Sequence, residues 1–276
     1  MSRVTAEAGR EEARSAVNGL GAGTLMALAA FGLAAGVGIT GIGPGGVLAT
    51  AGLLVLTQLS PAGVAGTAIV THVATGGLGS FAYHRSGQLQ EDDTRRTALI
   101  LAAAAVLGTP LGVLANGLVP AHVFAILLAA GAAVAGVLVW LRQRAAQTTR
   151  APHTAPHTAP RAATAVAIGL GVSIAAGLFG LGGPMLSVPL LVIAGTPILS
   201  ALGAAQAQSI VIAGVGTIGY LAQGSIDWPL AAVVGVPELA GVLVGHRIAQ
   251  AVPATWLTYS LGLALAALVP WLLLHG

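Results

Sequence analysis

Two glycine-rich segments contain the residues best suited to bind an anion through the backbone. They are residues 41–48 and residues 180–186, and each interrupts a long apolar run. Glycine and proline make the chain leave helical geometry there and resume it a few residues later. A helix that begins after such a break presents free N–H groups and the positive end of its dipole, which together bind oxyanions. The candidate binding residues are Gly43, Gly45, Gly46, Gly182 and Gly183.

Polar side chains in the middle of apolar segments form a second group of candidates. Thr71 and His72 lie in the first half, and Gln206, Gln208 and Ser209 lie in the second. One constant offset aligns Thr71 with Gln208 and His72 with Ser209. All five can donate a hydrogen bond to an anion, and His72 can also carry a proton. The alternative is hydrogen bonding between helices, worth about 0.6 kcal/mol on average in one membrane protein.

Glu238 is the acid that lies well inside an apolar segment. An ionised carboxylate there costs about 3 kcal/mol on insertion scales, so it needs compensation. Protonation, pairing with His246 or Arg247 along the same segment, or a proton relay would each supply it. Glu238 and His72 are therefore candidates for proton coupling, with a structural pairing of Glu238 as the alternative. Asn116, near a segment end, is a weaker binding candidate.

Composition places these residues in a membrane protein. The chain is 56% hydrophobic and 7% charged, with a mean hydropathy of +0.90, whereas soluble domains carry about 25% charged residues. No charged residue occurs in residues 15–84, 97–141, 162–226 or 248–276. One helix needs about 20 apolar residues to cross a bilayer. The apolar runs are continuous, which excludes the alternating pattern of a membrane β-barrel.

The apolar segments fall into two groups of five, and the second member of each group is short. We predict an all-α polytopic membrane protein with eight to ten crossings, in two homologous, inverted halves with glycine-rich helix breaks. The segments are residues 20–40, 47–59, 64–83, 97–118 and 122–141, then 162–179, 185–194, 201–221, 230–249 and 256–274.

Charged and proline-rich stretches separate the parts of the chain. Residues 1–18 form a solvated tail, residues 19–141 the first transmembrane repeat, and residues 162–276 the second. Residues 142–161, between the repeats, contain arginine, proline and histidine and form an extended linker. Cytoplasmic loops carry an excess of arginine, so we place this linker in the cytoplasm.

Several kinds of chemistry have no support in the sequence. The chain has no cysteine, which excludes disulfides and thiolate metal sites. It has no lysine, which the Gly-Xaa4-Gly-Lys-[Ser/Thr] nucleotide loop requires. Its histidines are scattered, and Ser209 has no histidine three or four residues away. We expect no cofactor, no metal, no nucleic-acid partner and no enzymatic activity, although a residue pairing distant in sequence leaves a membrane-embedded enzyme as an alternative.

The two breaks, the duplication and the Gly-Xaa-[Leu/Ile] elements at residues 87–89 and 224–226 resemble those of the sulfite exporter TauE/SafE family of membrane permeases. The resemblance covers residues 20–276, and Pro44 departs from the family's glycine-rich pattern. It implies a permease that moves small sulfur-containing anions, such as sulfite or organosulfonates, commonly outward.

The resulting prediction is a secondary transporter in the bacterial inner (cell) membrane. It would bind its anion between the two breaks and work by alternating access. Its expected partners are a small anionic substrate, the lipid bilayer and protons, and the sequence is compatible with a monomer and with a homodimer. An anion channel is the other alternative.

Overall fold

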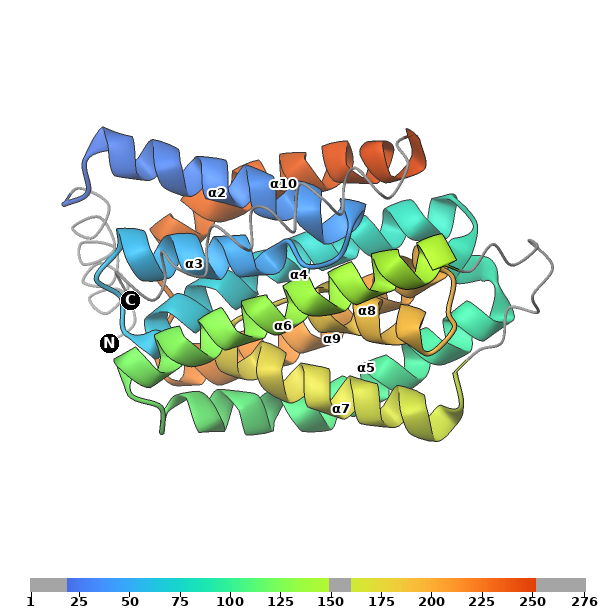
Figure 1. Cartoon of the computed structure of the whole chain (residues 1–276). Coiled ribbons are helices and arrows are strands. Elements are labelled where there is room, and N and C mark those ends of the chain that lie inside the picture. The colour runs from blue at the N-terminus through green and yellow to red at the C-terminus, as the bar shows by residue number, and fades with distance from the viewer. Residues whose placement is uncertain (1–18, 149–159, 252–276) are drawn as a thin grey trace.

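The computed structural model describes residues 19–148 and 160–251, and these form helices and connecting loops without a β-strand (Figure 1). The predicted all-α fold is confirmed. Six of the helices, α2, α5, α6, α7, α9 and α10, are long and apolar enough to cross a membrane. The predicted tail, residues 1–18, and the predicted last segment, residues 256–274, lie outside the described residues. The helices are α2 (Ala22–Gly41), α3 (Gly46–Leu56), α4 (Pro61–Arg85), η1 (Gln88–Gln90), α5 (Asp92–Asn116), α6 (Ala121–Thr148), α7 (Ala162–Phe179), α8 (Pro184–Ile193), α9 (Ile198–Ala222) and α10 (Trp228–Ala251).

Two helices are much shorter than the rest, and each follows a glycine-rich segment. Helix α3 has 11 residues and α8 has 10, about half the length needed to cross a bilayer. The chain turns between α2 and α3 at Gly43, whose φ is +115°, and between α7 and α8 at Gly180, whose φ is +71°. Left-handed backbone of this kind favours glycine because it has no Cβ.

The two halves are interleaved rather than side by side. Helix α2 of the first half packs mainly against α10 of the second, and α7 of the second half packs mainly against α5 of the first. Figure 1 shows α2 and α10 next to each other, although they lie at opposite ends of the described chain. Helices α4 and α9, the third predicted segment of each half, pack against each other between these pairs.

Helices α4 and α9 run in opposite directions. Ser200, near the start of α9, donates a hydrogen bond to Glu91, which follows α4. The backbone N–H of Asp227, which follows α9, donates to Thr67 near the start of α4. Each helix therefore begins where the other ends.

One hydrogen bond is repeated in the two halves. The hydroxyl of Tyr83 on α4 donates to the carbonyl oxygen of Thr40 on α2, at 2.6 Å. The hydroxyl of Tyr220 on α9 donates to the carbonyl oxygen of Gly177 on α7, at 2.7 Å. Donor and acceptor are 43 residues apart in both cases. Each tyrosine thus fixes the last turns of the helix that precedes a glycine-rich segment.

Small residues allow the paired helices to approach closely. A Cβ added to Gly36 of α2 would lie 2.0 Å from the carbonyl oxygen of Glu238, and one added to Gly241 of α10 would lie 2.3 Å from that of Leu33. The α5–α7 pair has the same feature, because a Cβ at Gly112 would lie 2.1 Å from the carbonyl oxygen of Ile174.

Replacing Gly36 with valine is expected to force α2 away from α10 and to destabilise the protein by about 1–3 kcal/mol, as overpacking does in a close-packed interior. Gly23 on the same helix is the matched control, since no atom lies within 4 Å of an added Cβ there. Thermal unfolding of both variants in detergent measures the difference. Equal melting temperatures would contradict the close α2–α10 contact.

Some predicted boundaries are wrong. The linker does not begin at residue 142, because α6 continues to Thr148; the stretch is rich in Arg, Ala and Gln, which are good helix formers. Helix α5 begins at Asp92 rather than at residue 97, and its first turn contains Asp92 and Asp93, which the helix dipole favours at that position. Arg95 and Arg96 consequently lie on α5 and not in a loop.

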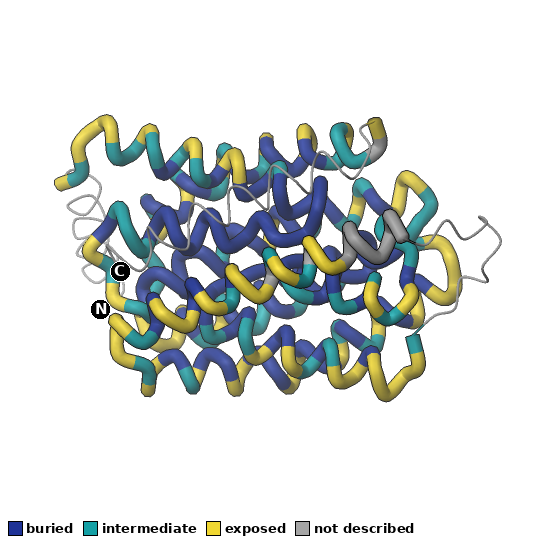
Figure 2. The backbone as a smooth tube through the Cα atoms, in the orientation of Figure 1, coloured by how far each residue is buried: buried dark blue, intermediate teal, exposed yellow. Residues whose placement is uncertain are grey.

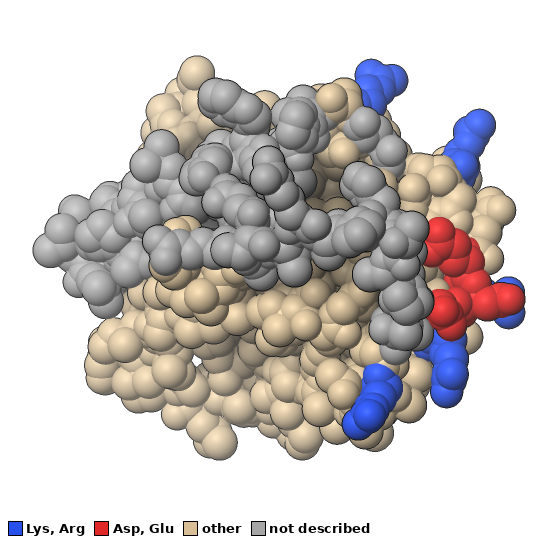
Figure 3. Space-filling view, turned by 45° about the vertical axis from the view of Figure 1, so that its right-hand side comes forward, with Lys and Arg blue, Asp and Glu red and all other residues tan. Residues whose placement is uncertain are grey.

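Buried segments and charged side chains lie in different parts of the molecule. The chain is buried continuously at residues 38–53 and 179–185, which include all of the first glycine-rich segment and all but the last residue of the second, and Figure 2 shows this region inside the bundle. Figure 3 shows arginine and acidic side chains gathered at one end. Charged residues are frequent around the connection between α4 and α5, which includes Arg85, Glu91, Asp92 and Arg95.

Candidate functional site

The two glycine-rich segments meet inside the protein. A Cβ added to Gly43 would lie 2.9 Å from the carbonyl oxygen of Pro184, and one added to Gly46 would lie 3.5 Å from the backbone nitrogen of Gly182. Helix α3 begins at Gly46 and α8 begins at Pro184. The first N–H groups of a helix have no partner within it. Two helix N-termini, each with a positive dipole end, therefore lie next to each other in a buried region.

His72 and Ser209, which the sequence alignment pairs, lie on either side of this junction. The Nε2 atom of His72 on α4 is 3.3 Å from the position of a Cβ at Gly46. The Oγ atom of Ser209 on α9 is 2.9 Å from the position of a Cβ at Gly182, and it accepts a hydrogen bond of 3.3 Å from the N–H of Gly183. Five of the predicted binding residues are thus brought together.

Glu238 contacts the same group of residues from α10. Its Oε1 atom lies 3.1 Å from Nε2 of His72, without the alignment of a hydrogen bond. Its Oε2 atom accepts a hydrogen bond of 2.5 Å from the hydroxyl of Thr71. The exposed fractions of Glu238, His72 and Thr71 are 0%, 1% and 6%. Both proton-coupling candidates therefore lie in one buried cluster.

One of the three alternatives for Glu238, pairing with His246 or Arg247, is wrong. Those residues are more than two helical turns further along α10, or about 12 Å at 1.5 Å per residue. Helix α4 packs directly against α10 and brings His72 to Glu238 instead. The Nε2 atom of His246 lies 3.2 Å from the hydroxyl of Ser86.

The imidazole of His72 has a nitrogen without a partner. Its Nδ1 atom is buried and makes no hydrogen bond to any described residue. Buried polar atoms are nearly always hydrogen-bonded, and an unpaired one costs about 1–3 kcal/mol. A ligand at the junction that accepts a hydrogen bond would satisfy this nitrogen.

The structure gives Gln208 a set of internal partners. Its Oε1 atom accepts a hydrogen bond of 2.6 Å from Ser187 on α8, and its Nε2 atom donates to Ser173 on α7 at 3.2 Å and to the carbonyl oxygen of Gly169 at 3.4 Å. The side chain therefore ties α7 and α8 to α9. Ser173 and Ser187 could not be predicted from the sequence, because a serine in an apolar segment is common and carries no signal of its own.

The remaining candidates lie around the junction rather than at it. Gln206 donates to the carbonyl oxygen of Ile39 at 3.1 Å, and its buried Oε1 has no partner among the described residues. Gly45 packs against α2, since a Cβ there would lie 2.2 Å from the carbonyl oxygen of Ala35. Asn116 donates to the carbonyl oxygen of Leu178 at 2.7 Å, at the end of α7.

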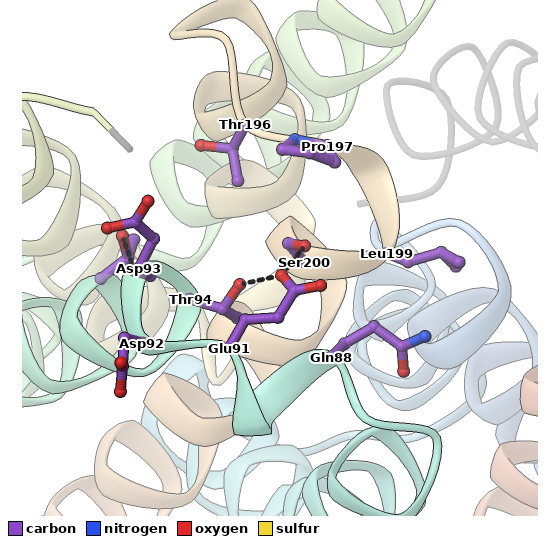
Figure 4. A pocket seen from close by; sticks show the side chains of 10 residues that line it. Gln88, Glu91, Asp92, Asp93, Thr94, Thr196, Pro197, Leu199 and Ser200 are labelled. Carbon is purple, nitrogen blue, oxygen red and sulfur yellow. Dashed lines mark hydrogen bonds between the residues drawn. The ribbon is translucent and has the colours of Figure 1, made fainter. Parts of the chain in front are cut away.

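A separate pocket opens at the charged end of the molecule (Figure 4). Its volume is about 560 Å³, and its lining combines residues of η1 and α5 with residues around the start of α9. The Oε2 atom of Glu91 accepts hydrogen bonds from Thr94 at 3.0 Å and from Ser200 at 3.1 Å. Glu91 therefore links the start of α5 to the start of α9. This pocket could not be predicted from the sequence, because the residues that line it come from segments far apart in the chain.

Comparisons with known proteins agree with the helical architecture. Residues 26–272 match the family described as sulfite exporter TauE/SafE. A curated relative, the probable membrane transporter protein YdhB of Bacillus subtilis (strain 168), is 26% identical over 221 residues, which cover 77% of this chain and 85% of the relative. No solved structure matches the chain. The chain therefore belongs to the sulfite exporter TauE/SafE family and is a multi-pass membrane transporter of the bacterial cell membrane.

Proposed function

We propose that this protein is a secondary transporter that exports small sulfur-containing anions, such as sulfite or organosulfonates. The observation that supports it best is the junction of the α3 and α8 N-termini, where His72 presents a buried nitrogen that has no partner among the described residues. Such an anion carries several acceptor oxygens around one sulfur atom. Backbone N–H groups, an imidazole and a serine hydroxyl can donate to these oxygens from different directions, and bonds to a charged acceptor are the stronger ones.

We infer that the two halves are inverted repeats that alternate access to this junction. Three observations support this: the reciprocal α2–α10 and α7–α5 pairs, the repeated tyrosine hydrogen bond and the antiparallel α4 and α9. Motion of one half against the other around a central site is how transporters with inverted repeats work. The arginine-rich end would face the cytoplasm.

Gradients would supply the energy, because the chain lacks the lysine of a nucleotide-binding loop. The family description supports sulfite as a substrate class. The buried junction favours small anions, since glycines surround it and a side chain at Gly46 would already contact His72.

Purified protein in liposomes loaded with sulfite is expected to exchange it for external sulfite and methanesulfonate with saturable kinetics, and to exchange acetate much more slowly. Radiolabelled flux measures each rate, and protein-free liposomes are the control. Flux that never saturates would indicate a channel. Chemical conversion of a lipid or peptide without any anion flux would indicate an enzyme, and folded protein that moves none of the anions would overturn the proposal.

A further inference from the structure

We propose that the His72–Glu238 pair carries the coupling proton, so that each monovalent anion is transported together with one proton. This inference rests on the proposed function and names its coupling ion. The imidazole and the carboxylate come from different helices, α4 and α10, and their facing atoms are 3.1 Å apart. Both side chains are fully buried, and the imidazole lies against Gly46 at the start of α3. The proton-binding groups therefore stand directly beside the proposed anion site.

The carboxylate of Glu238 is an anion of the protein itself, and it lies beside the proposed substrate site. One oxygen accepts a hydrogen bond from Thr71 and the other faces the imidazole nitrogen of His72. In the proposed cycle, the empty site holds this carboxylate opposite a protonated imidazole, so that the pair is neutral. When a substrate anion binds the imidazole, the junction contains two negative groups and one positive group.

Among the described residues, no other side chain on the surrounding helices can remove this excess charge. Helices α2, α3, α7 and α8 contain no titratable residue. Helix α9 contains only Tyr220, whose hydroxyl donates to Gly177. The other titratable residues of α4 and α10 lie toward the charged end of these helices: Tyr83, His84, Arg85, His246 and Arg247. Glu238 and His72 are the titratable groups that face each other at the junction.

A net charge in the membrane interior is costly, so the loaded site is favoured when it is neutral. One proton taken from the solution by the pair restores neutrality: the imidazole stays charged, the carboxyl becomes neutral and the anion balances the imidazolium. Linkage makes the effect reciprocal, because a bound anion favours the proton and a bound proton favours the anion. When the site opens to the opposite side of the membrane, the anion and the proton are both released.

Transport of one monovalent anion with one proton moves no net charge. The membrane potential then has no effect on the accumulation of the anion, whereas a pH gradient drives it. Export of the anion with a proton is driven by the outward concentration gradient of the anion, and an inward proton gradient opposes it. Methanesulfonate is the sharpest probe, because it stays ionised at every pH used, so that any transported proton must be carried by the protein.

Liposomes containing the natural protein are expected to accumulate methanesulfonate about tenfold for an imposed gradient of one pH unit at zero potential. A potassium diffusion potential without a pH gradient should produce no accumulation. The double variant His72→Gln, Glu238→Gln removes both proton-binding groups and keeps two amides that can hydrogen-bond to each other. It should respond in the opposite way, to the potential and not to the pH gradient.

Asp227→Asn is the matched control. Asp227 caps α10 by accepting a hydrogen bond of 3.0 Å from the N–H of Leu230, at the end of α10 opposite the charged end, and asparagine caps a helix equally well. This variant should respond to the pH gradient as the natural protein does. A double variant that still follows the pH gradient, or a natural protein that follows the potential, would overturn the coupling and leave the proposed transport intact.

If the double variant moves no anion, proton uptake on binding decides the question. A pH-indicating dye should report one proton taken up for each methanesulfonate bound by the natural protein in detergent, and none for the double variant. Equal uptake by both would overturn the inference. Failure of the natural protein to bind or move any of the anions would overturn the proposed function and this inference with it.

Discussion

Replacing Gly46 with valine is expected to weaken anion binding about 100-fold, which corresponds to about 2.8 kcal/mol. The Cβ of the new side chain would stand 3.3 Å from Nε2 of His72 and 3.5 Å from the backbone nitrogen of Gly182. Its methyl groups would fill the junction where the anion is proposed to bind. Titration of purified protein with methanesulfonate measures the affinity, and sulfite serves as the second ligand.

Two glycine variants separate binding from folding. Gly77→Val on α4 should bind as the natural protein does, because no atom lies within 4 Å of an added Cβ there. Gly45→Val should yield little folded protein, since its Cβ would lie 2.2 Å from the carbonyl oxygen of Ala35. Substitution of Gly183 is less informative, because its Cβ would lie 2.9 Å from the carbonyl oxygen of Ala205. If a folded Gly46→Val protein binds methanesulfonate as tightly as the natural protein does, the proposed site is wrong.

Replacing His72 with leucine is expected to destabilise the protein by about 3–5 kcal/mol, because it leaves the buried carboxylate of Glu238 without the imidazole that faces its Oε1 atom. The double variant His72→Leu, Glu238→Leu should recover most of this loss, since well-packed apolar residues replace buried pairs at little cost. Unfolding in detergent measures both, and the exposed residue His122 provides the control variant His122→Leu. If the losses from the single His72 and Glu238 variants simply add in the double variant, the two side chains do not interact.

The sequence was sufficient for the fold class. Apolar runs and glycine-rich interruptions are local signals, and helix boundaries follow them to within a few residues. The constant offset aligns His72 with Ser209 in the sequence, but their meeting at one junction follows from the packing of α4 and α9 around the two short helices.

The partner of Glu238 could not be predicted from the sequence. Its contact with His72 depends on how α10 rotates and packs against α4, and this packing is set by glycines far apart in the chain. The roles of Gln206 and Gln208 could not be separated either. Both are buried amides on α9, and only the positions of Ser173 and Ser187 show that one of them is internally satisfied.

The α2–α10 pair has a consequence for biosynthesis. Helix α2 is the first described helix to leave the ribosome, and α10, its main packing partner, is the last. At synthesis rates of about 5–20 residues per second, α2 waits on the order of ten seconds or more before that partner exists. During this time Gly32 and Gly36, which pack against α10 in the folded protein, are exposed to lipid or to other nascent chains. A chain that stops before α10 is complete would therefore leave its first helix without a partner.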